Sequence, residues 1–445
     1  MRICNRTTFA RIGVLSVLLI AVTLIAAGPS QRSGLAASTE VTVNLQTTGA
    51  PFLQGAFQLV SDGVGNQFYP HVDCDLASYT NDDFQGSSTI HYQNLTTGVD
   101  DIVPGNQVDL LSQVSGNRIA FTEVDFPGDS VIVFDALTQT RTMVPGYGKA
   151  RPSIGGNLVA FEDRGGFTNY ECEVGTYDID TGTVARLTSD SMDNRFISVS
   201  PNGDALVWEK CQLNDTACDI YSAVQTSPGV FSTRALTVGG AEDLLPRTDG
   251  ELAVYMSNRG GDYDIYYQPV TGGTEVRLAI PGDQRDPTIS GNLISFESQD
   301  QNGTYDIFVY DLRTSRLFQV TDTGNYLDET LSDLSVCNGV GRIIYDIPGN
   351  DFDVHVFTFQ VPGTTEGEIG NLITTVRSFN LPQGITNSLI VKLQDAQAAD
   401  TTTACSALTD FIHECQAQAG KKLTVDQSNQ VIASANQIRT ELGCL

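Results

Sequence analysis

Short apolar runs alternate with turns rich in glycine and asparagine along most of this chain, and each run closes on an aromatic residue. Some runs are close copies of one another, as in Gly-Asn-Leu-Val-Ala-Phe161 and Gly-Asn-Leu-Ile-Ser-Phe296. The closing aromatic recurs at intervals of 40 to 49 residues, at Tyr79, Phe121, Phe161, Trp208, Tyr255, Phe296 and Tyr345. A repeat of this length that contains only strands and turns predicts a radially closed array of small sheets, which is an all-β propeller.

Two further strands follow each aromatic. The first alternates β-branched or aromatic residues with others, as in Asp264-Ile-Tyr-Tyr and Asp306-Ile-Phe-Val. The second comes after a turn, as in Leu317-Phe-Gln-Val-Thr321. A proline often marks the strand that begins the repeat, as at Pro287. Each repeat therefore supplies the strands of one propeller blade.

The last repeat lacks its outermost strand. After Asp353–Gln360 the chain reaches Pro362-Gly-Thr-Thr and supplies no further strand. A strand of the missing type lies before the first repeat, at Phe57–Asp62. We predict that this N-terminal strand completes the final blade and closes the ring, which removes its exposed edges. The count is seven blades, or six if the weakest repeat, residues 325–361, is not a blade.

One repeat carries a recognisable unit: Ser200-Pro-Asn-Gly203, Leu206-Val-Trp208 and Asp219-Ile-Tyr221. These residues resemble the TolB-like propeller family with its PD40-type repeats, whose unit reads roughly Ser-Pro-Asp-Gly, Ile-Ala-Phe and Asp-Ile-Tyr. The resemblance covers about residues 57–361. It implies an interaction platform or the non-catalytic partner of a separate hydrolase domain. Many members are described as six-bladed, so seven blades depart from the family pattern.

From Glu366 onward the hydrophobic spacing becomes helical. Leu408, Phe411, Ile412 and Cys415 follow i, i+3, i+4, i+7 spacing, and Thr424 with Gln427 three residues later predicts a capped final helix. The stretch Phe411-Ile412 to Thr424, preceded by Leu381-Pro-Gln-Gly-Ile385, resembles the FIMAH helical domain of many exported bacterial proteins. That domain is an accessory to others. The expected organisation is a signal peptide (1–37), a propeller (41–361) and a FIMAH-like helical domain (362–445).

The N-terminus predicts export. Arg2, Arg6 and Arg11 precede an apolar run from Ile12 to Ala27, and small residues at Ala36-Ala37 offer a cleavage site. The run is shorter than the roughly 20 residues that span a bilayer. We therefore expect a secreted or extracytoplasmic bacterial protein with no membrane insertion after signal removal. An uncleaved anchor is the alternative.

The charge narrows the range of partners. The net charge is −28, and removing residues 1–37 takes away four arginines and no acid, which leaves −32. Such a chain repels phosphate backbones, so nucleic acid is excluded as a partner. The remaining expectation is a protein or a cell-surface polysaccharide.

Eight cysteines follow the predicted signal peptide, which favours disulfides in an exported protein. A hairpin that pairs Trp208 with Tyr221 sets Cys211 opposite Cys218. If the last two helices are antiparallel, Cys405 lies near Cys444. Two more cysteines lie near the starts of the first and last blades, which are neighbours in a closed ring. The expected pairs are Cys211–Cys218, Cys405–Cys444 and Cys74–Cys337, while Cys172 and Cys415 stay unassigned.

Local patterns for catalysis are absent from the sequence. No Gly-x-Ser-x-Gly segment occurs, and the four histidines are scattered, so neither catalytic nor cofactor-binding residues are assigned. Acidic pairs with calcium-compatible spacing are the only metal candidates: Asp262, Asp264, Asp351 and Asp353. Calcium is thus the one cofactor considered. Aspartate is also favoured in turns for backbone hydrogen bonding alone.

Two functions remain after these observations. The first is an exported, non-catalytic binding or scaffold protein. The alternative is a carboxylate-dependent carbohydrate-active enzyme, a polysaccharide lyase or a glycosidase, working in the central funnel. The alternative requires a tight cluster of acids with a basic or aromatic partner there. The sequence does not specify the ligand, the binding face or the oligomeric state.

Overall fold

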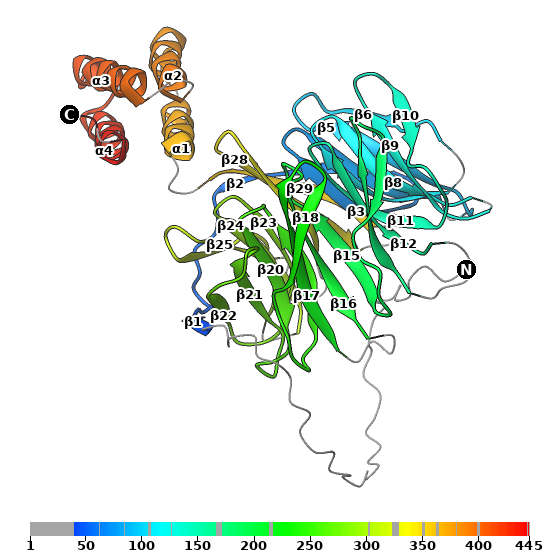
Figure 1. Ribbon diagram of the computed structural model, residues 1–445. Helices are drawn as coiled ribbons and strands as arrows, with labels where there is room; N and C mark the ends of the chain where they lie inside the picture. The colour runs from blue at the N-terminus through cyan, green and yellow to red at the C-terminus, as the bar shows by residue number, and fades with distance from the viewer. Residues whose placement is uncertain are drawn as a thin grey trace.

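The computed structural model describes residues 40–444 apart from 62, 84, 106–107, 126, 166–170, 213–216, 301–302, 323–328, 349–351, 362–364, 380, 398–400 and 443. Within this part of the chain, seven β-sheets are arranged around an axis and four α-helices follow them (Figure 1). The seven-blade propeller with a C-terminal helical region is therefore confirmed. The predicted signal peptide at 1–37 lies outside the described residues.

Each blade is an antiparallel sheet whose strands run outward from the axis in chain order. The innermost strands, which contact one another around the ring, are β3 (Asn66–Asp73), β7 (Asp109–Ser115), β11 (Lys149–Gly155), β15 (Asp193–Val199), β19 (Asp243–Thr248), β23 (Gln284–Ser290) and β27 (Thr330–Cys337). The second strands are β4 (Leu76–Asp82), β8 (Arg118–Glu123), β12 (Leu158–Asp163), β16 (Ala205–Cys211), β20 (Leu252–Ser257), β24 (Leu293–Gln299) and β28 (Val340–Pro348). The third strands are β5 (Ser88–Asn94), β9 (Ser130–Asp135), β13 (Glu173–Asp178), β17 (Cys218–Ser227), β21 (Asp264–Pro269), β25 (Tyr305–Asp311) and β29 (Phe352–Gln360). The outermost strands are β6 (Val99–Ile102), β10 (Thr140–Met143), β14 (Thr183–Arg186), β18 (Val230–Ala235), β22 (Glu275–Ala279), β26 (Arg316–Gln319) and β2 (Gly55–Ser61).

The ring closes through an N-terminal strand, as the incomplete last repeat predicts. Strand β2 pairs antiparallel with β29, with Phe57 opposite Phe357. An additional strand, β1 (Glu40–Asn44), pairs parallel with β22 of the fifth blade. Between them, Phe52 bridges to Gln319 of the sixth blade. We name residues 40–61 the N-terminal strap. The strap contacts the outer edges of the fifth, sixth and seventh blades, and it adds a strand to the fifth and the seventh.

The seven recurring aromatics occupy equivalent places on the second strands and are at most 3% exposed. Each lies opposite a third-strand residue, and the pair is often aromatic, as in Tyr255 with Tyr266 and Phe296 with Phe308. In the third blade the partner of Phe161 is Gly175. A Cβ on Gly175 would lie 2.3 Å from the Phe161 ring, so the ring fills the space of the missing side chain. The recurring aromatics are therefore core residues that pack inside their own blades.

The C-terminal region consists of α1 (Thr365–Ser378), α2 (Gln383–Gln397), α3 (Thr401–Gln418) and α4 (Val425–Glu441). Their apolar faces share one core, which includes Leu408, Phe411 and Cys415. The expected capping box is present, because Gln427 N–H donates to Thr424 Oγ1 and Thr424 N–H donates to Gln427 Oε1. In the part of the chain that the structure describes, none of the helices has the length and hydropathy of a membrane span.

Among the disulfides whose two cysteines both lie in the described residues are the three pairs that the sequence analysis expected: Cys74–Cys337, Cys211–Cys218 and Cys405–Cys444. The first joins the first blade to the last, with the two Cα atoms 5.4 Å apart. The second closes the hairpin of the fourth blade. The third ties α3 to the residues after α4. Cys415 is a buried free thiol in the helical core.

Candidate functional site

A β-bulge recurs at the same place on the innermost strands. In each bulge one residue, which we name the bulge residue, has a φ between 48° and 58°, in the left-handed region. The bulge residues of the first six blades are Tyr69, Leu111, Arg151, Phe196, Leu245 and Asp286. None is glycine, so each conformation costs on the order of 1–3 kcal/mol and persists only because the surrounding structure holds it.

The bulge residues face the propeller axis. Both faces of every blade are covered by neighbouring blades, and the outer edge lies three strands away. An exposed side chain on an innermost strand therefore meets solvent near the axis or at the two ends of the ring. Tyr69 is 47% exposed and the Asp286 side chain 32% exposed, so both meet the solvent space beside the innermost strands, which we name the axial channel.

The bulges are held by hydrogen bonds between neighbouring blades. The acceptor is the side chain of the residue directly after the recurring aromatic, and the donor is a backbone N–H in the bulge of the next blade. The pairs are Thr80 with Leu111, Thr122 with Arg151, Glu162 with Phe196, Glu209 with Leu245, Glu297 with Leu331 and Asp346 with Tyr69. In the fifth blade Met256 holds this place, and its thioether is only a weak acceptor.

Two of these carboxyl-bearing residues, Glu297 and Asp346, lie within electrostatic reach of the sixth bulge residue, Asp286. Glu297 is fully buried and Asp346 nearly so, while Asp286 is open to the channel. Desolvation raises the pKa of Glu297, and the nearby charge of Asp286 raises it further. Desolvation, with a contribution from Asp286, also raises the pKa of Asp346 to about 7. We name Asp286, Glu297 and Asp346 the axial carboxylate cluster.

Two arginines accompany the axial carboxylate cluster. The Arg285 Nε donates to Glu297 Oε2 at 2.5 Å and lies 3.8 Å from Asp286 Oδ2. The Arg285 guanidinium also lies 3.6 Å from the centre of the Tyr305 ring. The positive charges of Arg285 and Arg247 oppose the burial that raises the pKa of Asp286. The result is a partly exposed carboxyl at Asp286 beside two buried carboxyls whose pKa values are raised toward neutral pH.

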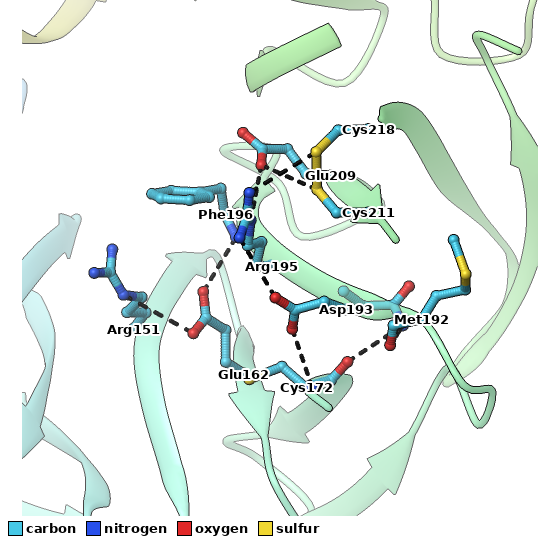
Figure 2. Close-up of polar contacts among 11 residues, drawn as sticks. Arg151, Glu162, Cys172, Met192, Asp193, Arg195, Phe196, Glu209, Cys211 and Cys218 are labelled. Carbon is cyan, nitrogen blue, oxygen red and sulfur yellow. Dashed lines mark hydrogen bonds and ion pairs between the residues drawn. A yellow bond between two sulfur atoms is a disulfide. The ribbon is translucent and has the colours of Figure 1, made fainter. Parts of the chain in front are cut away.

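The third and fourth blades carry a different charged group, which Figure 2 shows around Arg195. Arg195 Nε donates to Glu209 Oε2 at 3.1 Å, and Arg195 Nη1 donates to Asp193 Oδ2 at 3.4 Å. The bulge residue Phe196 has the guanidinium carbons of Arg151 and Arg195 at 5.1 and 5.6 Å from its ring centre. Here the bulge residue is aromatic, and the acids make structural hydrogen bonds and ion pairs.

Three of the four calcium candidates lie within the described residues. Asp264 Oδ2 accepts a hydrogen bond from Arg277 Nη2 at 2.7 Å, Asp262 is exposed, and Asp353 is half-buried on β29. Asp351 lies outside the described residues. Among the described residues, the groups of three potential metal ligands lie elsewhere, and each contains a disulfide-bonded pair. Calcium binding at the four aspartates stays a prediction.

The histidines are held in structural pairs. His71 Nδ1 lies 3.1 Å from Asp333 Oδ2, and His91 Nδ1 lies 3.2 Å from Asp100 Oδ2. His355 stacks on Tyr345, and burial lowers the pKa of its imidazole. Within the described residues, no histidine is hydrogen-bonded to a serine or cysteine.

No model of a known protein family matches the chain, and no curated protein matches it. Solved structures share its fold. A prolyl endopeptidase matches with TM-score 0.50 at 13% identity, over 70% of this chain and 51% of that one. The β-propeller domain of the Trilobed protease from Pyrococcus furiosus matches with TM-score 0.50 at 12% identity, over 67% of this chain and 95% of that one. An oligogalacturonate lyase from Vibrio parahaemolyticus matches with TM-score 0.50 at 12% identity, over 70% of this chain and 94% of that one.

These similarities establish the propeller fold alone, because the identities are low. The chain spans about half the length of the prolyl endopeptidase. TolB from Acinetobacter baumannii also matches, but its TM-score of 0.37 carries no functional argument. With no family model matched, the TolB-like repeat and the FIMAH-like domain stay predictions.

The prediction of a non-catalytic binding or scaffold protein is corrected by this comparison. The structures that match with a TM-score of 0.50 are mainly enzymes: a prolyl endopeptidase, puromycin-hydrolysing peptidases and an oligogalacturonate lyase. The sequence analysis considered carboxylates but did not single out Asp286, Glu297 and Asp346, because 53 acidic residues offer many pairs and these three lie on separate strands. A signal was nevertheless present, since glutamate follows the aromatic in Phe161-Glu162, Trp208-Glu209 and Phe296-Glu297.

Proposed function

We propose that this protein is an extracytoplasmic enzyme that hydrolyses glycosidic bonds of an uncharged polysaccharide at the axial carboxylate cluster. The observation that carries the proposal is the position of Asp286, a carboxylate open to the channel and electrostatically coupled to the buried carboxyls of Glu297 and Asp346. This is the cluster of acids with a basic partner that the carbohydrate-active alternative requires.

Glycoside hydrolysis uses two carboxyl groups in different protonation states. One donates a proton to the leaving oxygen, so its pKa must be raised toward the working pH. In this proposal Glu297 is the proton donor, because burial and the charge of Asp286 both raise its pKa, and the substrate must displace the Arg285 contact to reach its buried carboxyl. Asp286 is the ionised partner: burial raises the pKa of its carboxyl, and the charges of Arg285 and Arg247 oppose that shift. Asp346, in the seventh blade, is a second buried carboxyl with a raised pKa beside Asp286.

The charge of the whole chain favours a neutral substrate. A net charge of −28 repels polyanions such as polyuronates, which a lyase would require. Export, the PD40-type repeats and the FIMAH-like helical region are part of the same proposal. The three disulfides support export, since such bonds persist in oxidising compartments.

The experiment measures new reducing ends after incubation with neutral xylan, mannan, β-glucan and α-glucan. We expect one of these to be cleaved, and we expect Glu297→Gln and Asp286→Asn each to lower the rate by about a hundredfold or more. Glu162→Gln is the matched control, because Glu162 is a buried glutamate with the same interblade hydrogen bond in the third blade. Equal losses in all three variants would contradict the assignment. Polygalacturonate serves as the lyase substrate, and an unsaturated product from it would favour elimination instead.

A further inference from the structure

The axial channel contains an aromatic side chain that neither the fold nor the proposed chemistry requires. Tyr69 is the bulge residue of the first blade, with a φ of 52° and 47% of its surface exposed. The equivalent residues in other blades include leucine, arginine and aspartate, so the backbone conformation does not call for an aromatic ring. A large aromatic exposed at a strained position is typical of a binding surface.

Tyr69 is connected directly to the axial carboxylate cluster. Its backbone N–H donates to the carboxylate of Asp346, which feels the charge of Asp286 in turn. Its ring meets Phe68 edge to face, with centroids 5.1 Å apart and an interplanar angle of 90°. Asp346, a member of the cluster, therefore holds the backbone of Tyr69 in place, and the Phe68 ring restricts the orientation of the Tyr69 ring.

Sugar rings present apolar C–H faces and a rim of hydroxyl groups. An exposed phenol ring contacts the apolar face, and carboxylates with an arginine accept and donate hydrogen bonds at the rim. Tyr69 and Asp286 both lie on innermost strands, and Asp346 links them, because it accepts the Tyr69 backbone N–H and feels the charge of Asp286. A metal ion would use the carboxylates but would leave the Tyr69 ring exposed.

We propose that Tyr69 is a substrate-binding residue that stacks on a pyranose ring next to the bond cleaved at the axial carboxylate cluster. The inference rests on the proposed function for the identity of the ligand as a neutral glycan. It assigns Tyr69 to positioning and specificity, with no part in proton transfer. Binding at Tyr69 is separable from catalysis, and this allows the two proposals to fail independently.

The test uses the full chain and isothermal titration with xylohexaose, mannohexaose, cellohexaose and maltohexaose. The Asp286→Asn variant serves as the background in which bound oligosaccharide is not consumed. We expect one oligosaccharide to bind, Tyr69→Ala to weaken its binding by about tenfold or more, and Tyr69→Phe to retain binding within about threefold. Alanine keeps the same φ demand as tyrosine, so the comparison isolates the ring.

Tyr147→Ala is the control, because Tyr147 is a similarly exposed aromatic in the turn before β11. Unchanged affinity in Tyr69→Ala, equal losses in the Tyr69 and Tyr147 variants, or no binding of any of the four oligosaccharides would each overturn the inference. If the oligosaccharide binds in a way that depends on Tyr69 but the native chain does not cleave it, Tyr69 remains a glycan-binding residue. The proposed hydrolysis is then rejected.

Discussion

The hydroxyl of Thr122 in the second blade accepts a hydrogen bond from the backbone N–H of Arg151 in the third, at 2.9 Å. Thr122 is almost fully buried, so water does not replace a lost partner. We expect Thr122→Val to lower the free energy of unfolding by about 1–3 kcal/mol, because the N–H of Arg151 is left unpaired. Urea denaturation measures the change.

The control for Thr122 is Thr140→Val, since Thr140 is exposed on the outer strand of the same blade. Its effect should stay within about 0.5 kcal/mol. Thr122→Ser keeps the hydroxyl and should recover most of the loss. Equal stability of the native chain and Thr122→Val would show that the interblade hydrogen bonds do not stabilise the ring.

Removing the Cys74–Cys337 disulfide should cost more stability than removing the hairpin disulfide. The first joins residues separated by 263 positions, and the second joins Cys211 to Cys218, separated by 7. Loop-closure entropy gives about 5 kcal/mol for the long loop and about 2 kcal/mol for the short one. Double serine variants of each pair, compared by chemical denaturation, test the difference. Equal losses for the two pairs would contradict this account.

The buried carboxyls should make the protein less stable as the pH rises. Burial raises the pKa of Glu162 and of Asp346 to about 7, from ordinary values of 4.5 and 3.8. The folded chain therefore holds protons that the unfolded chain has released. The stabilisation from these groups is complete below about pH 4 and is lost as the pH rises through about 7.

Urea midpoints measured at pH 5 and pH 7.5 test this prediction, with the lower midpoint expected at pH 7.5. Glu162→Gln should reduce the difference between the two midpoints, because a glutamine does not titrate. Glu251→Gln, at an exposed position, is the matched control and should leave the difference unchanged. A midpoint that rises with pH by the same amount in all three chains would refute the role of the buried carboxyls.

The N-terminal strap should stabilise the propeller in part through the buried side chain of Leu53. Leu53 is 7% exposed in the core of the last two blades, whereas its neighbour Phe52 is 50% exposed. We expect Leu53→Ala to cost about 2–4 kcal/mol, because it removes buried methyl groups and leaves a cavity. Phe52→Ala should cost less than about 1 kcal/mol. Thermal denaturation of the two variants under identical conditions decides between a packed strap and a loosely attached one.

The features of this structure that could be predicted are those that recur in the sequence. The aromatics such as Trp208 and Tyr255 mark one core position per blade, and the missing strand of the last blade identified β2 as the closing strand. Strand β1 was not predicted, because its five residues lie outside the repeat. Nothing in the repeat pattern indicates that a further strand pairs in parallel with an outer strand.

The candidate site was hidden for a different reason. A bulge residue is defined by the pairing of its strand, and the bulge residues share no residue type: Leu111, Phe196 and Asp286 occupy equivalent places. The axial carboxylate cluster also draws Glu297 and Asp346 from different repeats. Asp286 and Glu297 come together through the pairing of β23 with β24, and the packing of the sixth blade against the seventh brings Asp346 within electrostatic reach of Asp286.

The pairing of β2 with β29 has a consequence for biosynthesis. Six blades are each built from contiguous residues and can form in order as the chain emerges. The seventh cannot, because Phe57 must wait for Phe357 before its strand has a partner. Until then an apolar edge stays open to other chains. We therefore expect a newly made molecule to be most prone to self-association before β29 emerges. It should depend most on chaperones at that stage.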